Sequence, residues 1–171
     1  MSTQSSEQAS CMQVEPTAEH QWLKQFVGEW TFEAECVTGP DQPPFKSTGR
    51  EKVRMLGDLW LVFEGESTVP GMGMMRSLMM LGYDPAKKRF VGSWACTVMT
   101  HMFVYSGVRD ASGAVLPLDT EGPDFADPAK VARYQDVHEL RADGRRGFWA
   151  QCLGPDGNWV RFMNATYTRV K

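Results

Sequence analysis

The sequence predicts an all-β fold, an antiparallel up-and-down barrel of about ten strands preceded by one short N-terminal helix. Two observations support this prediction. Apolar residues alternate with polar ones along much of the chain after residue 28, which is the period of a strand with one buried face. Turn signals recur between these runs, so that each strand is expected to pair with its neighbour in sequence.

The one helix that we predict covers residues 18–27. Its apolar side chains fall on one stripe, and Gly28 ends the run. These side chains are Trp22, Leu23, Phe26 and Val27. A helix this short and one-sided must lie on an apolar surface. Residues 1–15 are polar and lack the apolar region of a secretory signal, so we expect a disordered tail followed by a single barrel domain over residues 16–171.

Strand patterns follow one another from Gly28 to the end of the chain. The clearest runs are residues 30–36, 45–56, 59–68, 74–83 and 89–99. The last two form a hairpin around Asp84-Pro85, a pair that suits a type I turn. The one long, irregular connection is expected from Asp119 to Lys130. Long strands in nearest-neighbour order close most simply into a barrel, because closure removes the exposed edges.

The composition excludes several classes of protein. The net charge of −3 comes from interspersed acids and bases, so no broad cationic field exists to attract nucleic acid or an anionic membrane. No stretch approaches the roughly 18 apolar residues of a membrane-spanning helix. The four cysteines form no Cys-x-x-Cys pair, so neither a zinc nor a redox motif is predicted. We expect a soluble, cytoplasmic protein with no nucleic-acid and no membrane partner.

Gly28-Glu29-Trp30 follows the predicted helix directly, and this placement resembles the start of lipocalins and their relatives. In those proteins a short helical turn leads into a Gly-x-Trp on the first strand. The indole plugs one end of the barrel, often beneath an arginine of the last strand. The resemblance implies a lipocalin-like barrel in which Arg161 or Arg169 covers Trp30. The functional mouth is then expected at the opposite end.

A second resemblance spans nearly the whole chain beyond the tail. The matching runs are residues 20–23, 28–30, 81–85, 89–92, 100–101, 105–107, 118–123 and 134–137. On these runs the chain resembles a bacterial family, the domain of unknown function numbered 1579, more closely than it resembles true lipocalins. The family implies a calycin-like barrel and brings no established activity. The function therefore has to be argued from the residues.

Methionines and aromatic residues concentrate in the middle strands. The methionines by themselves slightly favour ordinary core packing, and together with the aromatic residues they also fit a partly open apolar cavity. A barrel of about ten strands is also too wide for side chains alone to fill easily. The leading hypothesis is a protein that binds a small, largely apolar molecule in this cavity. The candidate ligand-binding residues are His101, Tyr105, Trp94, Phe103, Met79, Met99, Asp119 and Glu121.

Three alternatives remain open. In the first, the chain is an enzyme of isomerase, cyclase or hydrolase type, in which His101 with Asp119 or Glu121 transfers protons. In the second, His101 or His138 is the axial ligand of a heme. In the third, apolar strand faces form a homodimer. The three histidines share no metal-ligand spacing, so no site with several protein ligands to a metal is predicted, and His20 is expected on the solvated side of the helix.

Overall fold

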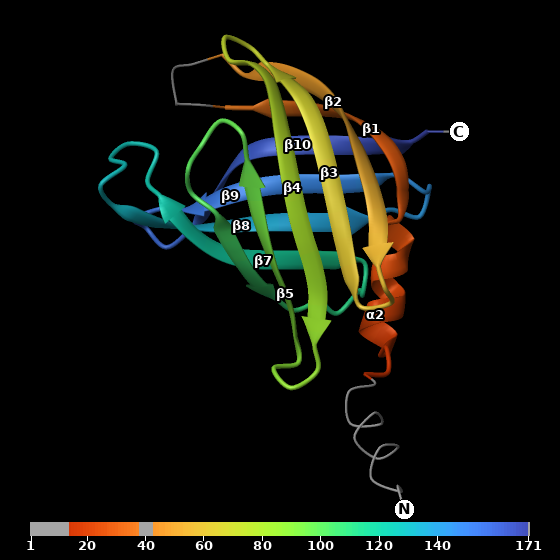
Figure 1. Ribbon diagram of the computed structural model, residues 1–171. Coiled ribbons are helices and arrows are strands. Elements are labelled where there is room, and N and C mark those ends of the chain that lie inside the picture. Colours follow the sequence, from red (N-terminus) through yellow and green to blue (C-terminus); the bar gives the residue numbers. More distant parts are fainter. Residues whose placement is uncertain (1–13, 38–42, 171) are drawn as a thin grey trace, which may run out of the picture.

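The computed structural model describes residues 14–37 and 43–170 and is a closed antiparallel barrel with a short helical segment at its start (Figure 1). The helical segment consists of α2 (Ala18–Leu23) and the 3-10 turn η1 (Lys24–Phe26). The strands are β1 (Gly28–Cys36), β2 (Phe45–Leu56), β3 (Trp60–Val69), β4 (Gly73–Asp84), β5 (Arg89–Cys96), β6 (Phe103–Gly107), β7 (Val115–Pro123), β8 (Val131–Leu140), β9 (Arg146–Leu153) and β10 (Trp159–Arg169). Each strand pairs with its sequence neighbour, and β10 closes on β1. The predicted ten-stranded up-and-down barrel with a short N-terminal helix is confirmed.

Two predictions concern the limits of the chain. The expected tail at residues 1–15 lies almost wholly outside the described residues, and a single domain over residues 16–171 stays a prediction. Within the described residues, no helix is both long enough and apolar enough to cross a bilayer.

The alternation that predicted the strands also decides which side chains face the barrel interior. On β2, Val53 is buried and Glu51 is partly buried, whereas Arg50, Lys52 and Arg54 between and beside them are exposed. The cross-strand partners of Val53 and Glu51 on β3 are Phe63 and Gly65, which continue the same inward rows. The inward face is thus continuous from strand to strand around the barrel.

The helical segment is shorter and more tightly wound than predicted. The α-helix ends at Leu23, and the 3-10 turn that follows places the Phe26 carbonyl oxygen 3.0 Å from the donating Nε1 of Trp30. His20 lies inside the protein, contrary to the prediction of a solvated side chain. Its Nδ1 accepts a hydrogen bond of 2.9 Å from the Thr17 backbone, and its ring contacts the edge of Tyr83. This contact anchors the helix start to β4.

Helix and turn close one end of the barrel. In Figure 1 they lie beside the turn between β2 and β3, where Lys24 Nζ is 2.9 Å from Asp58 Oδ1. Their apolar side chains enter a cluster of fully or nearly fully buried residues, which we call the plug. The plug consists of Trp22, Leu23, Phe26, Trp30, Val53, Leu61, Phe63, Leu81, Phe90, Leu116 and Leu118. Burying each large side chain stabilises the fold by roughly 1.5–3 kcal/mol, so this end is the main source of stability.

Trp30 lies at the centre of the plug between two cationic side chains. The Arg169 guanidinium carbon is 4.2 Å from the indole ring, and its Nη1 donates to the Val27 carbonyl oxygen at 2.7 Å. Arg169 is therefore the arginine that the resemblance implied, whereas Arg161 lies over Trp149. A Cβ at Gly28 would come within 2.1 Å of Arg169 Nη1, and Gly28 has a φ of 146°. The glycine before Trp30 is thus required by both space and backbone conformation.

The long connection predicted from Asp119 to Lys130 is wrong in its first half. Residues 119–123 belong to β7, and the connection covers residues 124–130. Leu118 and Thr120 are buried while Asp119 and Glu121 are exposed, which is ordinary strand alternation. The acidic residues suggested a loop because exposed strand positions and loops share the same polar composition.

Candidate functional site

The interior beyond the plug is lined by many small side chains, together with larger ones that include Phe32, Phe148 and Met163. The small side chains lie at inward positions in the middle of the strands and towards their opposite ends, and we call this region the open half. They are Ala34, Ser47, Gly49, Gly65, Ser67, Ser77, Thr120, Gly122, Ala132, Ala150, Cys152 and Ala165. Small residues cannot fill the width of a ten-stranded barrel. The open half is therefore the natural place for a ligand.

Among the described polar residues that face the interior, five form what we call the interior polar group: Glu51, Tyr105, Asp136, Arg146 and Tyr167. The Tyr105 hydroxyl donates to Asp136 Oδ2 at 2.6 Å, joining β6 to β8. Arg146 forms a salt bridge with Glu51 across the interior, between β9 and β2. The Arg146 guanidinium carbon also lies 4.4 Å from the ring of Tyr167 and 4.3 Å from that of Trp30. Arg146 thus connects the plug to the open half.

Burial dominates the electrostatics of the interior polar group. It raises the pKa of Asp136 to about 6, although the hydrogen bond from Tyr105 acts in the opposite direction. Burial and then the Asp136 charge raise the pKa of Tyr105 far above its usual range, and burial and then Glu51 raise that of Tyr167. Both tyrosines are therefore neutral donors at pH 7. Arg146 balances Glu51, which leaves Asp136 as one excess negative charge above pH 6.

Three members of the group, Glu51, Asp136 and Tyr167, retain surface that solvent can reach. Asp136 and Tyr167 occupy inward strand positions, and burial is the largest influence on the pKa of each. Both residues are nevertheless only partly buried. Trp94 and Phe103, also inward, are partly exposed in the same way.

His138 lies on the plug side of Asp136 on the same strand. Its ring contacts Phe26, Phe63 and Phe148, with ring centroids 5.2–6.1 Å apart. Burial, and secondarily the Arg146 charge, lower the pKa of His138 to about 3. His138 is therefore a neutral, enclosed side chain, and the geometry does not favour it as a heme ligand.

Aromatic side chains gather at the end opposite the plug, and we call them the aromatic rim: His101, Phe103, Phe125, Tyr134 and Phe162. Neighbouring rings of the rim have centroids 4.7–6.2 Å apart in edge-on contacts. Phe125, in the connection between β7 and β8, is 68% exposed. A Cβ on the adjacent Gly122 would come within 2.4 Å of the Phe103 ring, so this glycine makes room for the rim. The rim forms an apolar border at the end where a ligand would enter.

The structure separates the predicted site residues into two groups. Met79, Trp94, Phe103 and Tyr105 face the interior, and His101 lies at the rim with Nε2 3.0 Å from the Glu121 carbonyl oxygen. Asp119, Glu121 and Met99 lie outside the interior.

Asp119 and Glu121 occupy exposed outward positions on β7. Asp119 accepts a 2.9 Å hydrogen bond from Gln135 and lies 3.9 Å from Arg89. Met99 is 43% exposed in the connection between β5 and β6. The contact of His101 with Glu121 involves the backbone, so the structure does not bring His101 together with either predicted carboxylate. The proton-transfer hypothesis has no support from this arrangement.

The sequence interpretation missed the charged members of the interior polar group. Asp136 lies on the same face of its strand as Tyr134 and His138, and Glu51 lies on the same face as Val53. This alternation with buried neighbours is the signal that would have placed both carboxylates inside. Arg146 follows a turn directly, and no pattern in the sequence marks it as buried.

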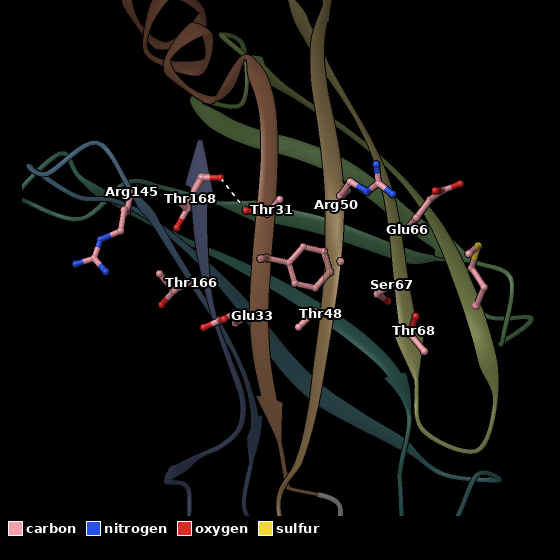
Figure 2. A pocket seen from close by; sticks show the side chains of 13 residues that line it. Thr31, Glu33, Thr48, Arg50, Glu66, Ser67, Thr68, Arg145, Thr166 and Thr168 are labelled. Carbon is pink, nitrogen blue, oxygen red and sulfur yellow. Dashed lines mark hydrogen bonds between the residues drawn. The ribbon is translucent and has the colours of Figure 1, made fainter. Parts of the chain in front are cut away.

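A concavity of about 560 Å³ lies on the face formed by β10, β1, β2 and β3 (Figure 2). Its lining is mostly hydroxyl and charged side chains, exposed or half-buried, on these strands and just before β9: Thr31, Glu33, Thr48, Arg50, Glu66, Thr68, Arg145, Thr166 and Thr168. Phe32, Gly49, Ser67 and Met74 complete it. Acidic and basic groups alternate there, and every charged side chain in the lining is exposed. We therefore place the candidate site in the interior and not in this groove.

Comparison with known proteins supports the fold. The family model described as "Protein of unknown function (DUF1579)" matches residues 15–169. The chain belongs to this family. A search of curated proteins finds no match. Among solved structures, the chain is similar to Rv2717c from M. tuberculosis, with 13% identity, a TM-score of 0.62 and coverage of 92% of this chain and 100% of that one. At that identity the likeness shows the fold alone.

Proposed function

We propose that this protein binds a small, largely apolar molecule in the open half of its barrel. The observation that supports the proposal is the row of small inward residues bordered by Trp94, Phe103 and the aromatic rim. Such a lining provides apolar walls and few polar groups, the usual composition of a small-molecule site. The plug closes the other end, so the ligand enters past the rim.

The test uses the neutral fluorescent probe N-phenyl-1-naphthylamine, titrated into the purified protein at pH 7.5. We expect saturable binding with enhanced fluorescence. Ala150→Phe places a ring in the interior at the level of Asp136, since Ala150 is the cross-strand partner of Asp136. This variant should weaken probe binding about tenfold or more, because the added ring occupies the same space.

Gln151→Phe is the matched control. It adds the same ring one position further along β9, where the side chain faces outward beside Gln135. Its probe affinity should equal that of the wild type. Thermal unfolding checks that both variants are folded, and Ala165→Phe replaces Ala150→Phe if the latter is not. Absence of saturable binding to the wild type, or equal binding by a folded interior variant, would overturn the proposal.

A further inference from the structure

The polar end of the proposed interior site is an acid without a counter-charge. Asp136 receives one hydrogen bond, from Tyr105, to Oδ2. Within the described residues, no basic side chain forms an ion pair with it. Arg146, the one cation at the inward positions of the described strands, is bound to Glu51. A charged carboxylate with one hydrogen bond and no ion pair, in a poorly solvated interior, lowers the stability of the fold unless a cation binds to it.

The surroundings of Asp136 offer a cation both charge and aromatic faces. Tyr105 and Tyr167 are neutral, and His138 is uncharged and enclosed on the plug side. Rings of Trp94 and Phe103 continue from Tyr105 towards the rim. Aromatic faces attract ammonium groups as well as apolar surface. Among the described side chains at inward positions beyond the plug, Arg146 is the only one that would repel a cation. Glu51 balances its charge.

We propose that the ligand of the interior site is a small amine, with an apolar body in the open half and a protonated nitrogen paired with the Asp136 carboxylate. This inference rests on the proposed function and specifies the chemical class of its ligand. A neutral hydrogen-bond donor of the same shape would satisfy the free carboxylate oxygen but leave the charge unbalanced. The amine should therefore bind more tightly than the matching alcohol.

The experiment compares 4-phenylbutylamine with 4-phenylbutan-1-ol as competitors of bound N-phenyl-1-naphthylamine. At pH 7.5 the amine should displace the probe at a concentration about tenfold lower than the alcohol, the difference expected for a charged hydrogen bond. The preference should disappear at pH 4.5. There Asp136 is protonated, since its pKa is about 6, while the amine keeps its charge. Tyr105, Tyr167 and His138 stay neutral between these pH values, because burial raises the pKa of both tyrosines and lowers that of His138 to about 3. The Glu51–Arg146 pair also faces the interior, and Asp136→Asn separates the contribution of Asp136 from that of the pair.

Two variants make the assignment specific. Asp136→Asn keeps the shape and an acceptor for Tyr105 but removes the charge, so it should retain the probe and lose the amine preference at every pH. Asp119→Asn removes a carboxylate from the exposed side of β7 and should keep the preference unchanged. If the wild type binds the probe but does not prefer the amine, or if Asp136→Asn keeps the preference, the amine inference is wrong and the proposed function stands. If the wild type does not bind the probe at all, the proposed function itself fails.

Discussion

The two halves of the barrel have the same strands but opposite contents. In the plug, Phe26, Trp30 and Leu61 are almost completely buried and packed against one another. In the open half, the same strands carry glycine, alanine and serine at inward positions, and partly exposed rings stand at the border. Packing stabilises a fold in proportion to buried apolar surface, whereas a ligand needs surface that is left unfilled. The chain meets both needs by concentrating its large residues at one end.

The largest expected effect belongs to the plug. Trp30→Ala removes a ring that is 1% exposed and contacts both Arg146 and Arg169. We expect it to lower the free energy of unfolding by about 3–5 kcal/mol, as for other large buried side chains cut to alanine. Urea denaturation of the two proteins measures the difference. The matched change in the open half, Ala165→Gly, should cost about 1 kcal/mol, and equal losses in the two variants would contradict the division into halves.

The second effect tests the connection between the halves. Arg146→Met leaves Glu51 buried without a partner and should lower the free energy of unfolding by about 3 kcal/mol. Adding Glu51→Gln removes the unpaired charge. The double variant should then be more stable than Arg146→Met alone, and denaturation of the two single variants and the double variant measures the coupling. Additive losses would mean that Glu51 and Arg146 do not act as a pair.

The smallest effect has the opposite sign and lies in the open half. The pKa of Asp136 is raised by folding from an ordinary value near 3.9 to about 6. The folded state therefore binds the proton more tightly, and the contribution of Asp136 to stability is lost as the pH rises from about 4 to 6. Asp136→Asn should raise the free energy of unfolding by about 2 kcal/mol at pH 7.5 and leave it unchanged at pH 4.

The measurement is a series of unfolding curves for the wild type and Asp136→Asn between pH 4 and 8. His138 acts in the other direction, because folding lowers its pKa to about 3 and acid then favours the unfolded chain. Its contribution is common to both proteins and cancels in their difference. A difference that is flat across this pH range would show that Asp136 is not the buried acid described here.

The sequence predicted the barrel well because its strand signals are local. The bounds of β2 were predicted without error at residues 45–56, since every second residue from Lys46 to Arg54 is polar, as on the exposed face of a strand. The plug was also predictable, because Gly28-Glu29-Trp30 follows a one-sided apolar helix. Both features depend on neighbours in the chain.

The candidate site was predicted only in part, because it depends on contacts between distant strands. Tyr105 was identified, but its partner Asp136 comes from another strand 31 residues away. Glu51 and Arg146 are 95 residues apart, and each alone resembles an ordinary surface charge. Asp119 and Glu121 were proposed because they fall in the acidic stretch taken for a long connection and in a run that resembles the family. Strand alternation turns their side chains outward.

The short contact between β6 and β7 has a consequence for how the barrel opens. Backbone pairing between these strands covers Ser106 with Asp119 and Gly107 with Leu118, whereas β7 and β8 pair over their full length. The bond from His101 to the Glu121 carbonyl oxygen adds a side-chain link across the same junction, beside the rim. Separating the barrel wall here breaks fewer hydrogen bonds than separating it at the β7–β8 junction. Hydrogen exchange of the amides along this junction should therefore proceed through partial opening of the barrel rather than through complete unfolding.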